Sequence, residues 1–191
     1  MKKPLFTAIK ILLAFTFLTG VVYPLAITGI AQLIFPHEAN GSIAMINGQP
    51  RGSELIGQTF NDPRYFSSRP SAGNYNAVPS SASNLGPTSD SLKIMIDNRR
   101  QAFIAFNHLP ANTVVPNEMA TASGSGLDPH ISPESAYLQM NRICSVRGFS
   151  VAQRQLLQKL IAKHTENAQF SVLGEPRVNV LALNCDLDLL K

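Results

Sequence analysis

Residues 123–132, here called the glycine-rich loop, hold the densest group of chemically capable side chains, with the sequence SGSGLDPHIS. Ser125, Asp128 and His130 are the residue types that act as nucleophile, orienting acid and base in hydrolases. The glycines can also present backbone N–H groups to an anion. Three triad members within six consecutive residues cannot easily converge, however, and Asp-Pro before a capped helix is ordinary turn chemistry. The pattern therefore favours a structural loop, with a hydrolase that uses these three side chains as the alternative.

The rest of the chain carries few signs of catalysis. It has no GxxxxGK[ST] phosphate loop and no DKTGT phosphorylation motif, so we do not expect it to split ATP itself. GxSxG, SxxK and HExxH motifs are also absent. Two cysteines have no metal-ligand spacing, and we expect two small buried side chains, one on a helix and one after a strand, rather than a disulfide: Cys144 and Cys185. The four histidines are scattered: His37, His108, His130 and His164. We predict no catalytic residue and no metal site.

An apolar run precedes this chemistry, because residues 11–35 contain no charged side chain. As a helix this run is roughly 37 Å long, enough to cross a ~30 Å hydrocarbon core with some tilt. Lys2, Lys3 and Lys10 precede it, and no further Lys or Arg occurs before Arg51. The positive-inside rule then places residues 1–10 in the cytoplasm and residues 36–191 outside.

A cleaved signal peptide is the competing interpretation of the same residues. Residues 29–31 (Gly-Ile-Ala) loosely resemble a cleavage site, and Pro24 could end an apolar signal region or bend a helix. The apolar run nevertheless continues through Phe35, beyond the about 7–15 residues of a typical signal region. We therefore favour a retained single-span anchor over a periplasmic binding module released by cleavage. Within the anchor, small residues and proline are typical of a helix packed on another helix: Gly20, Pro24, Ala26 and Gly29.

The 156 residues after the anchor are enough for one domain with its own core. Three of the sixteen basic residues precede the anchor, so the domain has 13 basic and 12 acidic residues. Its longest basic run is Arg99-Arg100, which excludes the electrostatic footprint of a nucleic-acid-binding protein.

Periodicity predicts the elements of this domain. Strands are expected over 43–46 and 51–56, joined by a turn at Asn47-Gly48, and over 170–173 and 178–183. Helices are expected over 90–107 and 133–147, and from 151 with Leu156, Leu157, Leu160 and Ile161 inward. Residues 61–90, rich in Pro, Ser, Gly and Asn, form the long loop, which we expect to be packed onto the domain. The predicted class is α+β: a transmembrane helix, then one external domain with a small β-sheet and about three helices.

Several motifs, read in order, resemble one protein family. They are Tyr23-Pro24-Leu25, Gly52 to Gln58, Arg69 to Ala72, Ser83 to Pro87, the glycine-rich loop, Gln139 with Arg142, and Val178 to Asn184. This pattern is similar to the C subunit of the Kdp-type potassium-transporting ATPase of bacteria, and the likeness covers the whole chain in order.

The resemblance implies a non-catalytic accessory subunit of an inner-membrane complex for high-affinity, ATP-driven potassium uptake. Its implied partners are a channel-like potassium-binding subunit and a P-type ATPase subunit. The implied roles are assembly and, as a catalytic chaperone, raising the ATP affinity of the ATPase subunit. Only that resemblance implies a link to ATP, and it does so through the ATPase subunit. The predicted topology separates the external loops of this chain from cytoplasmic ATP. Candidate docking residues are Arg69, Ser71, Asn84, Ser123, Ser125, Asp128, His130, Gln139, Arg142, Asn179 and Asn184. An internal Arg69–Asp128 pair is the alternative to docking through those two side chains.

Overall fold

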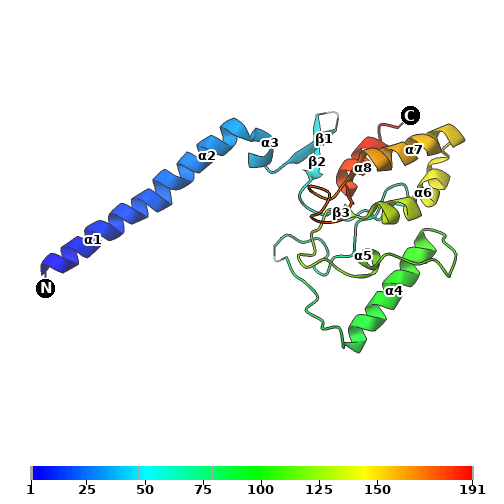
Figure 1. The fold of residues 1–191 in the computed structure, drawn as a ribbon, viewed down its shortest axis with the longest axis horizontal. Coiled ribbons are helices and arrows are strands. Elements are labelled where there is room, and N and C mark those ends of the chain that lie inside the picture. Colours follow the sequence, from blue (N-terminus) through cyan, green and yellow to red (C-terminus); the bar gives the residue numbers. More distant parts are fainter. Residues whose placement is uncertain (1, 47, 79, 191) are drawn as a thin grey trace. The chain divides into compact units, whose positions relative to one another are not determined.

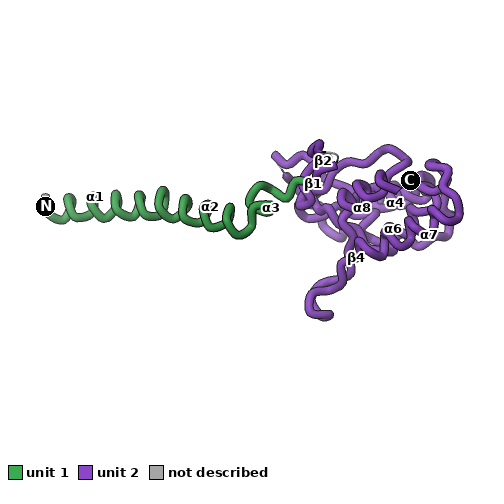
Figure 2. Tube along the Cα trace, turned by 90° about the horizontal axis from the view of Figure 1, so that it is seen from above, with its two compact units in different colours: residues 1–43 green, residues 44–191 purple. Residues whose placement is uncertain are grey.

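The fold of residues 2–46, 48–78 and 80–190 is described by a computed structural model (Figure 1). The chain divides into two compact units, residues 1–43 and residues 44–191 (Figure 2). The class is α+β, as predicted, with an N-terminal apolar helix, two small sheets and several further helices.

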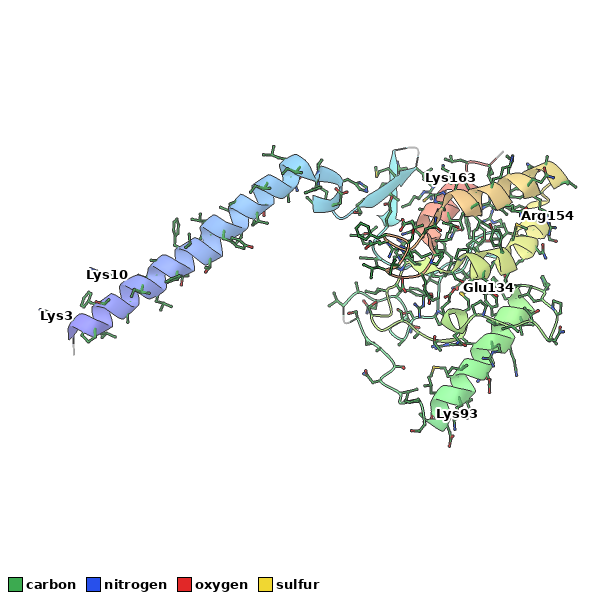
Figure 3. The ribbon with its side chains drawn as sticks, viewed as in Figure 1. Lys3, Lys10, Lys93, Glu134, Arg154 and Lys163 are labelled. Carbon is green, nitrogen blue, oxygen red and sulfur yellow. The ribbon has the colours of Figure 1, made fainter. Side chains whose placement is uncertain are left out.

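The first unit is helical from near its start. Helix α1 (Lys2–Phe17), a π-helical segment η1 (Leu18–Val22) and helix α2 (Tyr23–Ile34) follow without a break, and a single turn, α3 (Pro36–Ala39), comes next. The stretch Lys3–Ile34 has the length and apolar composition needed to cross a membrane. Figure 3 shows Lys3 and Lys10 on α1, at the N-terminal end of this stretch.

The π-helical segment explains how the helix accommodates its proline. Pro24 has no backbone N–H and its ring crowds the preceding turn. Directly before it, the Tyr23 N–H donates to the carbonyl of Leu18, five residues back instead of four. A Cβ atom added at Gly20 or Gly29 would meet nothing within 4 Å, so both positions are open on the helix surface.

A β-hairpin follows, formed by β1 (Ile43–Ile46), which begins at the last residue of the first unit, and β2 (Gln49–Ser53). Asn47, in the predicted turn, lies outside the described residues, whereas Gly48 has the expected positive φ, +74°. The second strand was expected over 51–56, but it begins and ends earlier.

The other sheet has three short antiparallel strands in the order β3-β5-β4. They are β3 (His130–Ile131), β5 (Arg177–Asn179) and β4 (Thr165–Glu166). The central Val178 pairs with Ile131 on one side and Thr165 on the other, and it is fully buried.

Two strand predictions near the C-terminus are wrong. The strand expected over 178–183 ends at Asn179, and α8 (Val180–Leu187) follows. A short apolar run fits a buried helix as well as a buried strand, and here Val180, Leu183 and Leu187 are buried at helical spacing. The segment 170–173 is a turn rather than a strand, because Phe170 has a φ of +53°.

Helix predictions in the middle of the domain are confirmed. Helix α4 (Asp90–Phe106) begins after a Ser89 cap, α6 (Pro133–Arg147) after a Ser132 cap, and α7 (Val151–Lys163) after a capping box of Ser150 and Gln153. A short helix, α5 (Asn117–Ala120), lies between α4 and α6 in sequence.

The core of this unit lies between α6, α7, α8 and β5, and its larger buried side chains are Phe66, Phe103, Met119, Ile131, Ile143, Leu157, Leu160, Ile161, Val178, Val180, Leu183 and Leu187. Leu156 was expected to point inward but is 46% exposed, and the buried side chains of α7 are Leu157, Leu160 and Ile161. Cys144 is buried on α6. Cys185 is half-buried on α8, not after a strand as expected, and both thiols are free.

Candidate docking surface

Close backbone contacts hold the long loop and the glycine-rich loop together. The Gly57 N–H, just before the long loop, donates to the carbonyl of Leu127 at 2.7 Å. Gly126 has a φ of +72°, and a Cβ atom there would lie 2.9 Å from the carbonyl oxygen of Ser81 and 3.1 Å from Oγ of Ser71. Glycine is therefore required at residue 126 both by backbone conformation and by space.

An ion pair joins the same two loops. Arg69 Nη1 lies 2.7 Å from Asp128 Oδ2, and the two side chains are 22% and 30% exposed. Tyr75 fixes the backbone at this arginine, since its hydroxyl donates to the Arg69 carbonyl at 2.6 Å. The internal pairing considered in the sequence analysis thus exists in the structure.

The Asp128 carboxylate also contacts His130, two residues further along the chain. The His130 N–H donates to Asp128 Oδ1 at 3.0 Å, and the ring Nδ1 lies 3.4 Å from the same oxygen. Burial alone would raise the pKa of Asp128. Hydrogen bonds from the His130 ring and backbone, together with the hydrogen bond and charge of Arg69, outweigh burial and lower that pKa to about 2. The carboxylate is therefore ionised at any physiological pH.

Ser125 does not complete a catalytic triad. Its exposed hydroxyl accepts the N–H of Leu127 at 3.1 Å, which is a local turn contact. Within residues 80–190 no hydrogen bond joins Ser125 to His130, whose ring instead contacts Asp128. The residues of the hydrolase alternative thus form an acid–base pair without a nucleophile in reach.

Two carboxamides predicted as docking residues are instead buried against the long loop. Asn184 on α8 accepts the Phe66 N–H at 2.8 Å and donates to the Phe66 carbonyl at 2.9 Å. Gln139 on α6 does the same for Ser67, with distances of 2.7 and 3.3 Å. Each side chain replaces the peptide group of a neighbouring strand, so the buried loop backbone keeps its hydrogen bonds.

Arg142 has a similar internal role. The residue is 1% exposed, and its guanidinium contacts the carbonyls of Pro63 and Tyr65 and donates through Nε to Asn107 at 2.9 Å. It also lies over the Phe106 ring, 4.4 Å from the centroid. Burial lowers its pKa to about 10. Gln139, Arg142 and Asn184 therefore lie inside the fold rather than at the surface where sequence reasoning placed them.

Asn179 forms part of a local structural element. Its side chain accepts the Ala182 N–H at 3.1 Å and caps α8, and it donates to the carbonyl of Glu54 at 2.7 Å.

The remaining candidates lie on the two loops. Ser71 accepts the N–H of Tyr75 at 2.9 Å. Ser123 is buried, and its carbonyl accepts the Gly126 N–H at 3.2 Å. Asn84 is exposed in a left-handed conformation, with a φ of +53°. The candidates on the two loops that stay at least partly accessible are thus Arg69, Ser71, Asn84, Ser125, Asp128 and His130.

Sequence reasoning missed a second cluster of polar contacts between distant segments. Arg147 Nη2 lies 2.8 Å from Asp188 Oδ1, and the Tyr65 hydroxyl donates to Asp188 Oδ2 at 2.9 Å. The guanidinium also lies 5.0 Å from the centroid of the Tyr65 ring. No local pattern links these residues, so this contact could be found only from the fold.

These features define a class of protein: an α+β domain that follows an apolar helix long enough to cross a membrane, with surface loops fixed by internal polar contacts. A family model described as K+-transporting ATPase, c chain (KdpC), matches residues 5–189. Similar proteins include potassium-transporting ATPase KdpC subunits of Methylococcus capsulatus, 50% identical over 96% of each chain, and of Koribacter versatilis, 48% identical over 98% of this chain and 95% of the relative. Another, from Mycobacterium tuberculosis, is 46% identical over the whole of both chains.

The chain belongs to the KdpC family. The predicted resemblance is confirmed over its full length. KdpC is the accessory rather than the catalytic subunit of the Kdp potassium-transporting ATPase, so the expectation of a non-enzymatic role is also confirmed.

Proposed function

We propose that this chain is a single-pass accessory subunit of a bacterial potassium-uptake ATPase, with residues 1–10 in the cytoplasm, 11–35 in the inner membrane and 36–191 in the periplasm. One observation carries the proposal: a full-length KdpC match begins with a helix that can span a membrane. Lys3 and Lys10 lie at the N-terminal end of that helix, as the positive-inside rule requires for this orientation (Figure 3).

A fusion of alkaline phosphatase after Lys191 tests the orientation, because this enzyme is active only outside the cytoplasm. The expected result is high phosphatase activity. A fusion that is expressed at full length but silent would reverse the topology and would bring the loops to the side where ATP is found.

The external domain, in this proposal, docks on a channel-like potassium-binding subunit and supports its assembly with the P-type ATPase subunit. The docking surface is the junction of the long loop and the glycine-rich loop. Two features support it: the junction carries polar groups that are still accessible, Arg69, Asp128 and His130 among them, and the ion pair holds these groups in fixed positions. An effect on ATP affinity would then be transmitted through the complex rather than by contact with the nucleotide.

Replacing Ser125 by Arg tests the docking surface without disturbing the ion pair. Ser125 is exposed and makes only a local turn contact, so the variant should fold normally. We expect the Ser125→Arg chain to lose co-purification with the ATPase subunits from solubilised membranes. Ser145→Arg is the matched control, since Ser145 is equally an exposed serine, on α6. If the Ser125→Arg chain co-purified with the ATPase subunits as well as the Ser145→Arg chain does, docking through this junction would be refuted.

A further inference from the structure

The connection between β4 and β5 ends in a projecting apolar tip. Residues 167–176 form this connection, and Figure 2 shows the chain next to β4 extending away from the body of the second unit. Phe170 is 89% exposed, Val172 80% and Leu173 60%. Elsewhere in the described part of the domain, Val114 and Val151 are exposed without such neighbours, and Leu55 and Ile56 form a less exposed pair, at 63% and 38%. A group of three on one short tip is the kind of patch that marks an interaction site.

The tip, here called the 169–173 finger, is ordered by its own hydrogen bonds. Gln169 and Leu173 form an antiparallel bridge, with N–H to carbonyl distances of 2.8 and 2.9 Å. Within it the N–H groups of Ser171 and Val172 donate to the carbonyls of Ala168 and Gln169. Because these donors are already satisfied, burying the finger against another surface does not leave them without partners.

Backbone strain at the tip also indicates a functional role for the exposed side chains. Phe170 and Ser171 have φ angles of +53° and +59°, a left-handed conformation that is uncommon for residues with a bulky side chain. Nothing in the core is gained from this strain, because the Phe170 side chain it presents is almost wholly exposed. The strained turn does, however, direct an aromatic side chain outward.

Charge defines the surface that the finger fits. Residues 167–174 contain no charged side chain, and at the base of the connection Arg177 Nη2 pairs with Glu166 Oε2 at 3.0 Å. The complementary surface is therefore uncharged and apolar. Among the described residues, the carbonyls of Phe170, Ser171 and Val172 accept no hydrogen bond. The rim of a protein pocket can supply donors to them, whereas lipid hydrocarbon cannot.

We propose that the 169–173 finger inserts Phe170 and its apolar neighbours into an uncharged pocket on the external face of another subunit of the potassium-transporting ATPase, and so acts as a hydrophobic anchor for assembly. This rests on the proposed function, which places the domain outside the membrane and against a partner subunit. Large aromatic side chains that enter a pocket dominate the binding energy of such interfaces.

Site-specific photocrosslinking in membranes that contain the intact complex tests the proposal. The photoreactive residue p-benzoylphenylalanine replaces Phe170 in the full-length chain, and a second chain carries it in place of Val151. Val151 is the control because it is an exposed apolar residue, 77% accessible, at the start of α7. We expect irradiation to join position 170 to a peptide of another ATPase subunit, identified by mass spectrometry, and position 151 to give no such product.

Other outcomes would overturn the proposal. Crosslinking of position 170 only to lipid would make the membrane the binding surface. No product from position 170 in a complex that co-purifies intact would refute the finger while leaving the proposed function in place. Failure of the wild-type chain to co-purify with ATPase subunits would refute both.

A second measurement does not depend on crosslinking chemistry. The double variant Phe170→Ser, Val172→Ser should dissociate from the solubilised complex roughly ten times faster or more, as expected for the loss of a buried hydrophobic anchor. Val151→Ser should leave the dissociation rate unchanged. Both variants should keep the melting temperature of the wild-type chain, since the replaced side chains are largely exposed. An unchanged dissociation rate in the double variant would contradict the proposal.

Discussion

Replacing Asp128 by Asn removes the negative charge at the junction of the two loops while keeping the shape of the side chain. In the folded chain the pKa of Asp128 is about 2, compared with an ordinary value of 3.8. Since one pKa unit corresponds to about 1.4 kcal/mol, the ionised carboxylate stabilises the fold by about 2 kcal/mol. The side chain is 30% exposed, and solvent screening makes this figure an upper bound.

The pH dependence has a definite sign. A carboxylate whose pKa is lowered by folding contributes its full stability above its unfolded pKa, and this stability is lost as the pH falls from about 4 to about 2. Asp186 also has a lowered pKa and adds to the acid sensitivity of the wild-type chain. That contribution is common to wild type and Asp128→Asn, so it cancels in the difference between them.

Urea unfolding of the full-length chain in detergent, followed by circular dichroism at pH 7 and pH 3, measures this difference. We expect Asp128→Asn to lower the free energy of unfolding by up to about 2 kcal/mol at pH 7 and by less at pH 3. Asp97→Asn is the control, because Asp97 pairs with Arg100 in an exposed position on α4 and should change stability by less than about 0.5 kcal/mol. If Asp128→Asn and Asp97→Asn were equally stable at pH 7, the ion pair would not hold the loops together.

Three further changes test the fold and the anchor. Asn184→Ala should destabilise the chain by about 3 kcal/mol in the same urea assay, because the buried N–H and carbonyl of Phe66 both lose their partner; a loss below about 1 kcal/mol would contradict that role. Gly126→Ala should lower the melting temperature through its positive φ and the contact with the long loop, whereas Gly124→Ala, where an added Cβ meets nothing within 4 Å, should not. Exchanging residues 11–35 for an unrelated apolar span should weaken co-purification with the ATPase subunits in detergent; undiminished co-purification would mean that the helix is only a tether.

Local sequence patterns were sufficient to predict the elements that depend only on interactions between residues close together in the chain. The absence of charge over residues 11–35 predicted the apolar helix, because helix formation in lipid depends on that segment alone. The caps at Ser89, Ser132 and Ser150 predicted where three helices begin, because a cap bonds only to the first turn of its own helix. The full-length order of motifs was sufficient to predict the KdpC family.

Only the tertiary structure decided how the polar residues of those motifs are used. Asn184 and Phe66 are 118 residues apart in the chain, and no local rule indicates that one side chain replaces the strand partner of the other. The run from Val178 to Leu183 has no periodicity that separates a strand from a helix, and Asn179 ends the strand because its side chain caps α8. The Arg69–Asp128 pair likewise depends on packing of the two loops through Gly57 and Gly126. Contacts between distant segments are set by the geometry of the whole domain, whereas caps and hydropathy act within a few residues of their own position.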